Sequence, residues 1–403
     1  MRGGRRGPAE PGGLARVSAD EWRGIGRMGL GVGVSIGLGA ILMRPRLLGR
    51  SDFLVDLTIV GVVAAVMFAT GIVLGHRRGI AWVFTVLIGL AGIGLRLGLH
   101  LPELSDVLDV TEAAIARWLA GGAPYGLGYD VSIPPGSPFP YGPVALLWYL
   151  PFNSALQSAE LATGIAVLTV LVLRGRPVGA AAYALSPLVA AAAVDGSNDT
   201  SAGLFLLVAL LALGRLPLVG GVLLALAAGF KLFAAAWLLP AVMIGGWRVL
   251  GGFGLGSAIA WGPAALAWGV APIISSLRRA LYIQPDPAYS LAALVEAVSR
   301  RRVSREVFLQ LRLIAGAGTA VAVLVLMRIR RVDLTIAGLA IFIVTIYSGY
   351  WASHAYLVMA APVVCWELDR WLGTAGWTVR WPLSPLRRLA DRLGAVRVGP
   401  AGD

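Results

Sequence analysis

Three carboxylates lie within seven residues of a chain that otherwise has few charges. Asp106, Asp109 and Glu112 follow the apolar run 80–99, in the segment LSDVLDVTEA. Read as a helix, residues 106–119 place the three acids on one side and apolar side chains on the other. A carboxylate at a membrane boundary can take a proton from an attacking hydroxyl. The alternative is structural, because acids in a first turn offset the helix dipole and Asp106 could be an ordinary N-cap.

The segment after this helix could bind a sugar. Residues 121–143 are rich in Gly, Pro and aromatic side chains, among them Tyr125, Tyr129, Phe139 and Tyr141. Such a composition predicts a rigid loop with few rotatable backbone bonds. Aromatic rings suit both sugar faces and anchoring at the membrane interface, and the sequence does not separate these two roles.

Several cations lie in or beside the apolar segments. Lys231, the chain's single lysine, lies between two apolar runs, where an ionisable group costs roughly 2.5–3.5 kcal/mol. It is therefore a functional candidate, with snorkelling at an interhelical turn as the alternative. Arg96 at a span end has the same two interpretations. The other candidates are the pair Arg278 and Arg279, and the arginines of the run SRRRVSRE at 299–306, which are Arg300, Arg301, Arg302 and Arg305. Lipid headgroups or a cytoplasmic location would also explain these charges.

A polar turn and a histidine complete the set of candidates. In DGSND, the side chains of Asp195, Asn198 and Asp199 offer oxygen ligands to a divalent cation such as Mg or Mn, or to sugar hydroxyls. The alternative is a polar turn that breaks a helix. His354, in GYWASHAYLVMAAP, could be a ligand or a proton relay, although an interfacial aromatic belt explains its neighbours equally well.

The composition predicts a polytopic membrane protein. Of the 403 residues, 58% are hydrophobic and only 14% are charged, whereas about a quarter are charged in soluble domains. The mean hydropathy is +0.79. The net charge of +13 comes almost wholly from arginines scattered between apolar segments, so nucleic acid is excluded as a partner. The lone Cys365 excludes disulfides and Cys-based metal sites.

Apolar segments predict an all-α bundle of about 12 membrane helices. Residues 143–152 are too short to cross and are expected to form a re-entrant or interfacial piece. The predicted division is a disordered basic tail over 1–24, a membrane domain over 25–368 and a basic tail over 369–403. The predicted spans are 25–42, 57–75, 80–99, 158–173, 178–194, 200–214, 216–230, 232–247, 249–274, 306–327, 332–351 and 352–368.

The arginine distribution predicts which side each loop faces. An even number of spans leaves both termini on one side, and the basic tails together with Arg77 and Arg78 make that side cytoplasmic. The loop 100–142, the turn 195–199 and the segment 275–305 are then extracytoplasmic. Positively charged loops of membrane proteins usually lie on the cytoplasmic side. Two groups of arginines fall on the outer side against this positive-inside rule; they are Arg44, Arg46 and Arg50, and the arginines of 299–306.

The order of these motifs resembles the GT-C superfamily of integral membrane glycosyltransferases. The nearest likeness is to the branch that uses polyprenyl-phosphate-mannose as donor, glycosyltransferase family 87 and its relatives. Here the acidic loop follows the third predicted span rather than the first, which implies two additional N-terminal helices. The matching pieces are Asp106 (or Asp109), GGAPY at 121–125, SPFPYGPVALLWYLP at 137–151, DGSNDTSAGLFLLVALLALGR at 195–215 and GGVLLALAAGFKLFAAAWLLP at 220–240.

The resemblance implies an activity for the chain. A sugar such as mannose would pass from a polyprenyl-phosphate lipid to a hydroxyl of a glycolipid or glycan acceptor, at the outer face of the cell membrane. The expected base is Asp106, with Asp109 as the second choice. The expected phosphate ligands are Lys231, Arg96, Arg278, Arg279 and Arg302. The expected sugar or acceptor ligands are Glu112, Tyr125, Tyr141, Asp195, Asn198, Asp199 and His354.

Other functions remain open from the sequence. A flippase or transporter of polyprenyl-linked lipids would use similar cations and aromatics, although no internal repeat of the transporter kind is evident. A polymerase or ligase of lipid-linked glycans is a third class. A nucleotide-sugar donor is disfavoured, because no cytoplasmic loop is large enough for a Rossmann-type domain.

Overall fold

The computed structural model describes residues 19–43, 81–98, 105–152, 155–280 and 289–372. Within these ranges every regular element is helical, and the only β-type pairing is an isolated bridge between Tyr129 and Ser137. The predicted all-α class is therefore confirmed. The elements are α1 (Ala19–Met43), α3 (Ala81–Gly98), α4 (Val107–Leu119), α5 (Pro143–Tyr149), η2 (Leu150–Phe152), α6 (Leu156–Leu173), α7 (Pro177–Leu185), α8 (Pro187–Ala192), α9 (Asp199–Leu213), α10 (Pro217–Phe230), η3 (Leu232–Trp237), α11 (Leu238–Gly245), α12 (Trp247–Trp268), α13 (Val270–Ala280), α14 (Leu291–Ser299), α15 (Arg305–Arg328), α16 (Leu334–Tyr347) and α17 (Tyr356–Trp371).

The helices have membrane character, but twelve spans are not confirmed. Among the described residues, α6, α12 and α15 are long and apolar enough to cross a bilayer. The predicted span 178–194 is two short helices, α7 and α8, and 57–75 lies outside the described residues. Shorter apolar helices are Gly29–Ala40, Thr85–Gly98, Pro143–Phe152, Asp199–Leu213, Pro217–Phe230, Leu232–Gly245 and Leu334–Tyr347. Segment 143–152 is α5 and η2, a short piece as expected.

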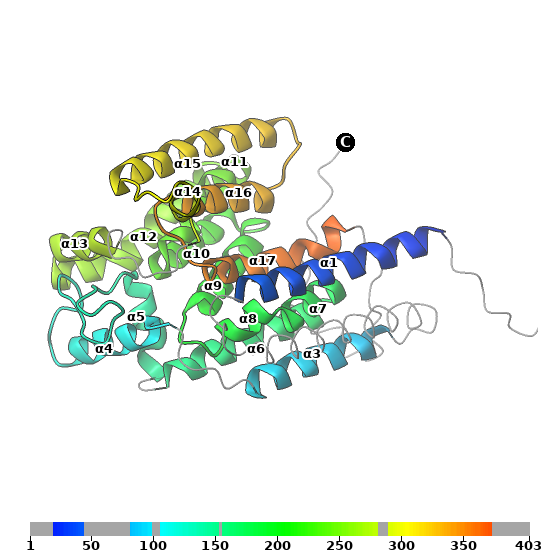
Figure 1. The fold of residues 1–403 in the computed structure, drawn as a ribbon, viewed down its shortest axis with the longest axis horizontal. Helices are drawn as coiled ribbons and strands as arrows, with labels where there is room; N and C mark the ends of the chain where they lie inside the picture. Colours follow the sequence, from blue (N-terminus) through cyan, green and yellow to red (C-terminus); the bar gives the residue numbers. More distant parts are fainter. Residues whose placement is uncertain (1–18, 44–80, 99–104, 153–154, 281–288, 373–403) are drawn as a thin grey trace, which may run out of the picture.

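The two ends of the bundle carry different segments (Figure 1). The start of α1 and the end of α17 lie at one end, whereas α4 and α13 lie at the other. Helix α1 begins at Ala19, inside the predicted tail 1–24, and α17 continues to Trp371. The predicted groups Arg44, Arg46 and Arg50, and Arg77 and Arg78, lie outside the described residues. Which end faces outward stays a prediction.

Helix breaks are frequent because prolines interrupt the apolar runs. Helices α5, α7, α8 and α10 each begin with Pro at the first position, where the missing N–H is not needed. Pro187 ends α7 because it cannot donate to the carbonyl of Tyr183. The backbone of Ser186 is extended at this break. A predicted single span is thus divided near its middle.

Arg96 of α3 caps this break. Its Nη2 donates to the Tyr183 carbonyl at 2.8 Å, and its Nη1 donates to the carbonyls of Ala184 at 3.2 Å and Gly92 at 2.9 Å. The guanidinium also lies 5.1 Å from the centre of the Tyr183 ring. A cation at the C-terminal end of α7 complements the helix dipole and satisfies carbonyls that lost their helical donors. Arg96, which is 1% exposed, therefore has a structural role.

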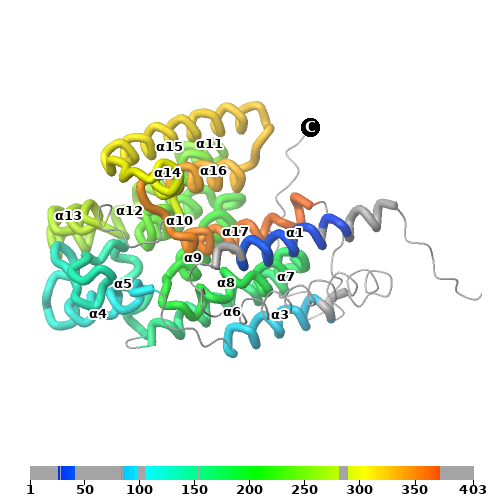
Figure 2. The backbone as a smooth tube through the Cα atoms, in the orientation of Figure 1, coloured from blue at the N-terminus to red at the C-terminus, as the bar shows by residue number. Residues whose placement is uncertain are grey.

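A second break separates α10 from η3 at Lys231. The Lys231 backbone is extended, with φ −141° and ψ 115°. The carbonyl of Phe230 accepts a hydrogen bond from the N–H of Gly142 at 3.3 Å. The loop before α5 thus docks on the end of α10. Figure 2 shows α10 in the interior of the bundle, between α12 and α9.

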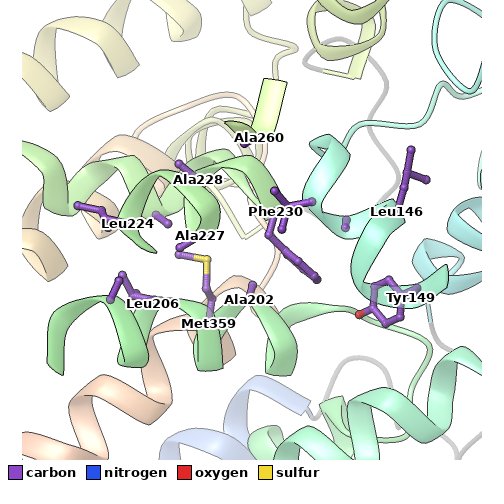
Figure 3. Close-up of a cluster of buried hydrophobic side chains, with 14 of the residues drawn as sticks. Leu146, Tyr149, Ala202, Leu206, Leu224, Ala227, Ala228, Phe230, Ala260 and Met359 are labelled. Atoms are coloured by element: carbon purple, nitrogen blue, oxygen red, sulfur yellow. The ribbon is translucent and has the colours of Figure 1, made fainter. Parts of the chain in front are cut away.

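The core around this second break is aromatic and aliphatic (Figure 3). The ring of Phe230 lies 5.9 Å from Tyr149 of α5 and 5.3 Å from Phe205 of α9. Met359 of α17 and Ala260 of α12 belong to the same buried cluster. Between membrane helices such contacts stabilise through van der Waals packing. This packing holds the start of α9 beside the end of α10.

Candidate functional site

A buried ion pair lies where α9 begins and α10 ends. The Nζ of Lys231 is 2.6 Å from Oδ1 of Asp199, and it donates to Oδ1 of Asn198 at 3.1 Å. The side chains of Lys231 and Asp199 are only 4% and 3% exposed. Asn198 is the N-cap of α9 and Asp199 is its first residue, so the helix dipole favours the negative charge there.

Two tyrosine rings cover the ammonium. The Nζ of Lys231 lies 5.5 Å from the centre of the Tyr141 ring and 5.0 Å from that of Tyr356. Tyr141 comes from the loop before α5, and Tyr356 is the first residue of α17. Aromatic faces attract a cation, most strongly when water is excluded. The end of α10, the start of α9, the loop before α5 and the start of α17 therefore meet at Lys231.

The loop that carries Tyr141 is held by its own aromatics. The Tyr125 hydroxyl donates to the carbonyl of Tyr141 at 3.0 Å. The Phe139 ring lies between these residues, 5.5 Å from each ring. Tyr125 is only 2% exposed. It therefore packs inside the loop, and its predicted contact with sugar is not supported by this position.

Gly142 fits the loop tightly against α10. A Cβ at this position would overlap the carbonyl oxygen of Gly229. We expect Gly142→Ala to displace Tyr141 and to lower the melting temperature of the purified protein by several degrees, because backbone must shift. The matched control is Gly254→Ala in α12, where an added Cβ meets nothing within 4 Å. Equal melting temperatures for the two variants would contradict this account of the loop.

Helix α4 is fixed to the DGSND turn by its backbone. The N–H of Ser105 donates to the Asp195 carbonyl at 3.0 Å, and that of Leu108 donates to the Gly196 carbonyl at 3.0 Å. Gly196 has a φ of +85°, a conformation that glycine adopts readily. This docking places the acidic helix beside the turn that carries Asp199.

Asp106 is the acid that contacts the loop. Its Oδ2 accepts the N–H of Ile133 at 2.5 Å. It occupies the N-cap position of α4, but its side chain makes no capping hydrogen bond, so ordinary capping does not explain it. Burial raises the pKa of the Asp106 carboxyl, the hydrogen bond from Ile133 opposes this, and Asp109 adds to the rise. Asp109 is half-buried and Glu112 is exposed.

Electrostatic coupling connects Asp106 with the ion pair. Burial raises the pKa of the Tyr141 hydroxyl well above its usual range. Nearby Tyr356 and the carboxylates of Asp199 and Asp106 raise it further. The hydroxyl of Tyr141 thus stays protonated as a hydrogen-bond donor.

The predicted phosphate ligands are not brought together. Arg96 is engaged with backbone carbonyls, as described above. Arg278 and Arg279 are exposed near the end of α13, and Nη2 of Arg279 lies 3.5 Å from the Gly136 carbonyl. Arg302 is exposed in the connection before α15. Of the five predicted cations, only Lys231 lies at the buried site.

The remaining predicted ligands lie close to the site. Asp195 contributes its carbonyl to Ser105, and its Oδ1 accepts the N–H of Ser197 at 2.9 Å. His354, which is 1% exposed, packs edge-to-face with Tyr289 at 5.0 Å. It lies two residues before Tyr356, whose ring covers Lys231.

The described residues do not support a metal site at the DGSND turn. In these parts of the chain, no three side chains from His, Cys, Asp and Glu gather closely enough to hold a metal ion. Oδ1 of Asn198 and Oδ1 of Asp199 instead face the ammonium of Lys231.

The structure also places a buried glutamate next to α9, which the sequence motifs do not predict. Glu160 of α6 accepts the hydroxyl of Tyr149 at 2.5 Å and the backbone N–H of Ser201 at 3.1 Å. Ser201 is the third residue of α9, so a carboxylate from another helix caps the helix that carries Asp199. An acid inside an apolar span was the signal that could have identified it.

Two polar groups at the start of α9 have no hydrogen-bond partner among the described residues. They are Nδ2 of Asn198 and Oγ1 of Thr200, both on fully buried side chains. A buried donor without a partner costs about 1–3 kcal/mol. Such groups are commonly satisfied by a ligand or an ordered water. The start of α9 therefore offers hydrogen-bonding capacity to a polar ligand.

Comparisons with models of protein families, with curated protein sequences and with solved structures found no match.

Proposed function

We propose that this protein is a membrane glycosyltransferase that moves a sugar from a polyprenyl-phosphate donor to a hydroxyl acceptor at the outer face of the membrane. The acceptor class is a lipid-linked or cell-envelope glycan. One observation carries the proposal: the segments 141–143, 195–199 and 229–231 meet around the buried Lys231–Asp199 pair, and the segment 105–109 is hydrogen-bonded to the turn 195–199.

Asp106 is the proposed general base. Sugar transfer to a hydroxyl requires a carboxylate that takes the acceptor proton as the new bond forms. Asp106 lies outside the apolar helices, beside the loop that carries Tyr141, and burial raises its pKa. A raised pKa makes the carboxylate a better proton acceptor than an ordinary Asp.

The ion pair and the turn are proposed to hold the polar part of the substrate. Two N–H groups of Lys231 are directed to Asn198 and Asp199, and an ammonium has three donors. The third could reach a phosphate or sugar oxygen. The unpartnered amide of Asn198 is a donor for a sugar hydroxyl.

The test is turnover by the purified full-length chain in liposomes. Radiolabelled polyprenyl-phosphate mannose and an envelope glycan fraction are supplied, and label in the glycan is measured. Transfer above the level of an Asp106→Asn preparation supports the proposal. Absence of transfer with several polyprenyl-phosphate sugars would refute it.

A flippase for polyprenyl-linked lipids is the second candidate, favoured by the helix breaks. Discontinuous helices, such as α7 and α8 or α10 and η3, are typical of transporter binding sites. The same liposomes distinguish the two, because a flippase would move labelled lipid between leaflets without transferring its sugar. A lipid-linked glycan polymerase would instead yield products of increasing length.

A further inference from the structure

Helix α15 carries an arginine that no carboxylate contacts within the described residues. Arg312 lies among apolar residues, eight positions into a helix long enough to span a membrane. Its Nε donates to the Thr345 carbonyl at 2.7 Å, and no other hydrogen bond is made to it within the described parts of the chain. Placing a charged side chain at such a position in a membrane is unfavourable in free energy, and such residues usually serve a function.

The residues around Arg312 leave space for its guanidinium. A Cβ on Gly349 would lie 3.0 Å from Nε of Arg312, so glycine makes the space for this side chain. Arg305 lies seven residues earlier, which puts it on the same face of α15, about 10 Å along the axis. Its guanidinium is 5.0 Å from the centre of the Tyr350 ring. Both arginines therefore face the segment that connects α16 to α17.

This segment leads directly to the buried ion pair. The ring of Trp351 lies 5.5 Å from Tyr356, and the Tyr356 ring lies 5.0 Å from Nζ of Lys231. The adjacent side chains of α15 point the other way, since Leu313 and Ile314 are 71% and 70% exposed. Arg312 is thus placed between a lipid-facing helix surface and the candidate site.

We propose that Arg312, assisted by Arg305, binds the phosphate of a long-chain lipid whose hydrocarbon tail lies along the outer surface of α15. The planar guanidinium can donate two parallel N–H bonds to phosphate oxygens. Nη1 and Nη2 of Arg312 are not used by protein acceptors in the described residues, whereas Nη1 and Nη2 of Arg96 donate to backbone carbonyls. That this lipid is the sugar donor rests on the proposed function.

The test measures binding without turnover. Farnesyl phosphate, which carries no sugar, is titrated into the purified full-length protein in nanodiscs of uncharged lipid, followed by calorimetry. Arg312→Gln should weaken binding at least tenfold, and Arg312→Lys should recover part of the loss because the charge remains. The matched control is Arg328→Gln, an exposed arginine at the far end of the same helix. Unchanged melting temperatures exclude misfolding as the cause.

Two further titrations show whether the site binds a lipid phosphate or free inorganic phosphate. Farnesol, which lacks the phosphate, should not bind, and inorganic phosphate should compete only weakly because the tail contributes. The proposal would be overturned if Arg312→Gln bound farnesyl phosphate as tightly as the unmodified chain. It would also be overturned if Arg328→Gln weakened this binding as much as Arg312→Gln. Full competition by inorganic phosphate would overturn its lipid part. Because no sugar is transferred, this result stands apart from the fate of the glycosyltransferase proposal.

Discussion

Replacing Asp106 by Asn is expected to lower sugar transfer by roughly 10²- to 10⁴-fold, the range for loss of a general base. The amide keeps the shape of the carboxylate but cannot accept the hydroxyl proton. Protein yield and melting temperature should change little, because the amide oxygen can still accept the N–H of Ile133. The measurement is initial rate of label transfer in liposomes at saturating donor.

The matched controls are the two other acids of α4. Asp109→Asn should have a smaller effect and Glu112→Gln almost none, because Glu112 is exposed on the helix surface. A variant Asp106→Asn with full activity would refute the assignment of the base. If Asp109→Asn abolished transfer and Asp106→Asn did not, Asp109 would take the role.

The rate should also depend on pH in a defined direction. The base works only when ionised, so transfer falls as the pH drops through the pKa of Asp106. Burial raises this pKa above the ordinary value of 3.8, so the fall should begin at a higher pH than for a solvated Asp. The residual transfer rate of the Asp106→Asn variant should not show this fall at low pH.

Replacing Lys231 by Met is expected to destabilise the protein by about 3–5 kcal/mol, because Asp199 would be left buried without its cation. The Met side chain fills a similar volume, so lost packing is a small part of the effect. The free energy of unfolding is measured in a single detergent. The control is Arg302→Gln, an exposed position where a change within about 0.5 kcal/mol is expected.

A double substitution separates the ion pair from other roles of Lys231. Lys231→Met together with Asp199→Asn removes both charges and should recover much of the lost stability, because no uncompensated charge remains. Stability equal to the sum of the two single losses would show that the residues do not interact. Transfer activity should remain low in the double variant, because the ammonium donor is absent.

Some features of the site could be predicted from residue types alone. Lys231 was identified because a lone lysine between apolar runs is costly, and the structure shows it buried and paired. Tyr141 and the DGSND turn were identified as polar or aromatic interruptions of apolar sequence, and they lie together. The predicted helix over 106–119 is observed as α4 over Val107–Leu119.

Other features could not be predicted, because they depend on partners distant in sequence. Arg96 was expected to bind phosphate, but Pro187 frees carbonyls of α7 that Arg96 then caps. Asn198 and Asp199 are predicted to offer oxygen to a metal ion or to sugar hydroxyls, and their contact with Lys231 from another helix is evident only in the structure. The role of Arg312 could not be predicted, because its position beside the segment before α17 is evident only in three dimensions.

The amino-acid sequence by itself determined the all-helical class, the membrane character and the residue types that could perform transfer. Apolar composition and helical periodicity act locally, so these properties can be read along the chain. Only the tertiary structure decided which charges are compensated and which acid faces the loop. Those outcomes arise where proline breaks two helices and separate segments meet, and no local pattern specifies the partners of a buried charge.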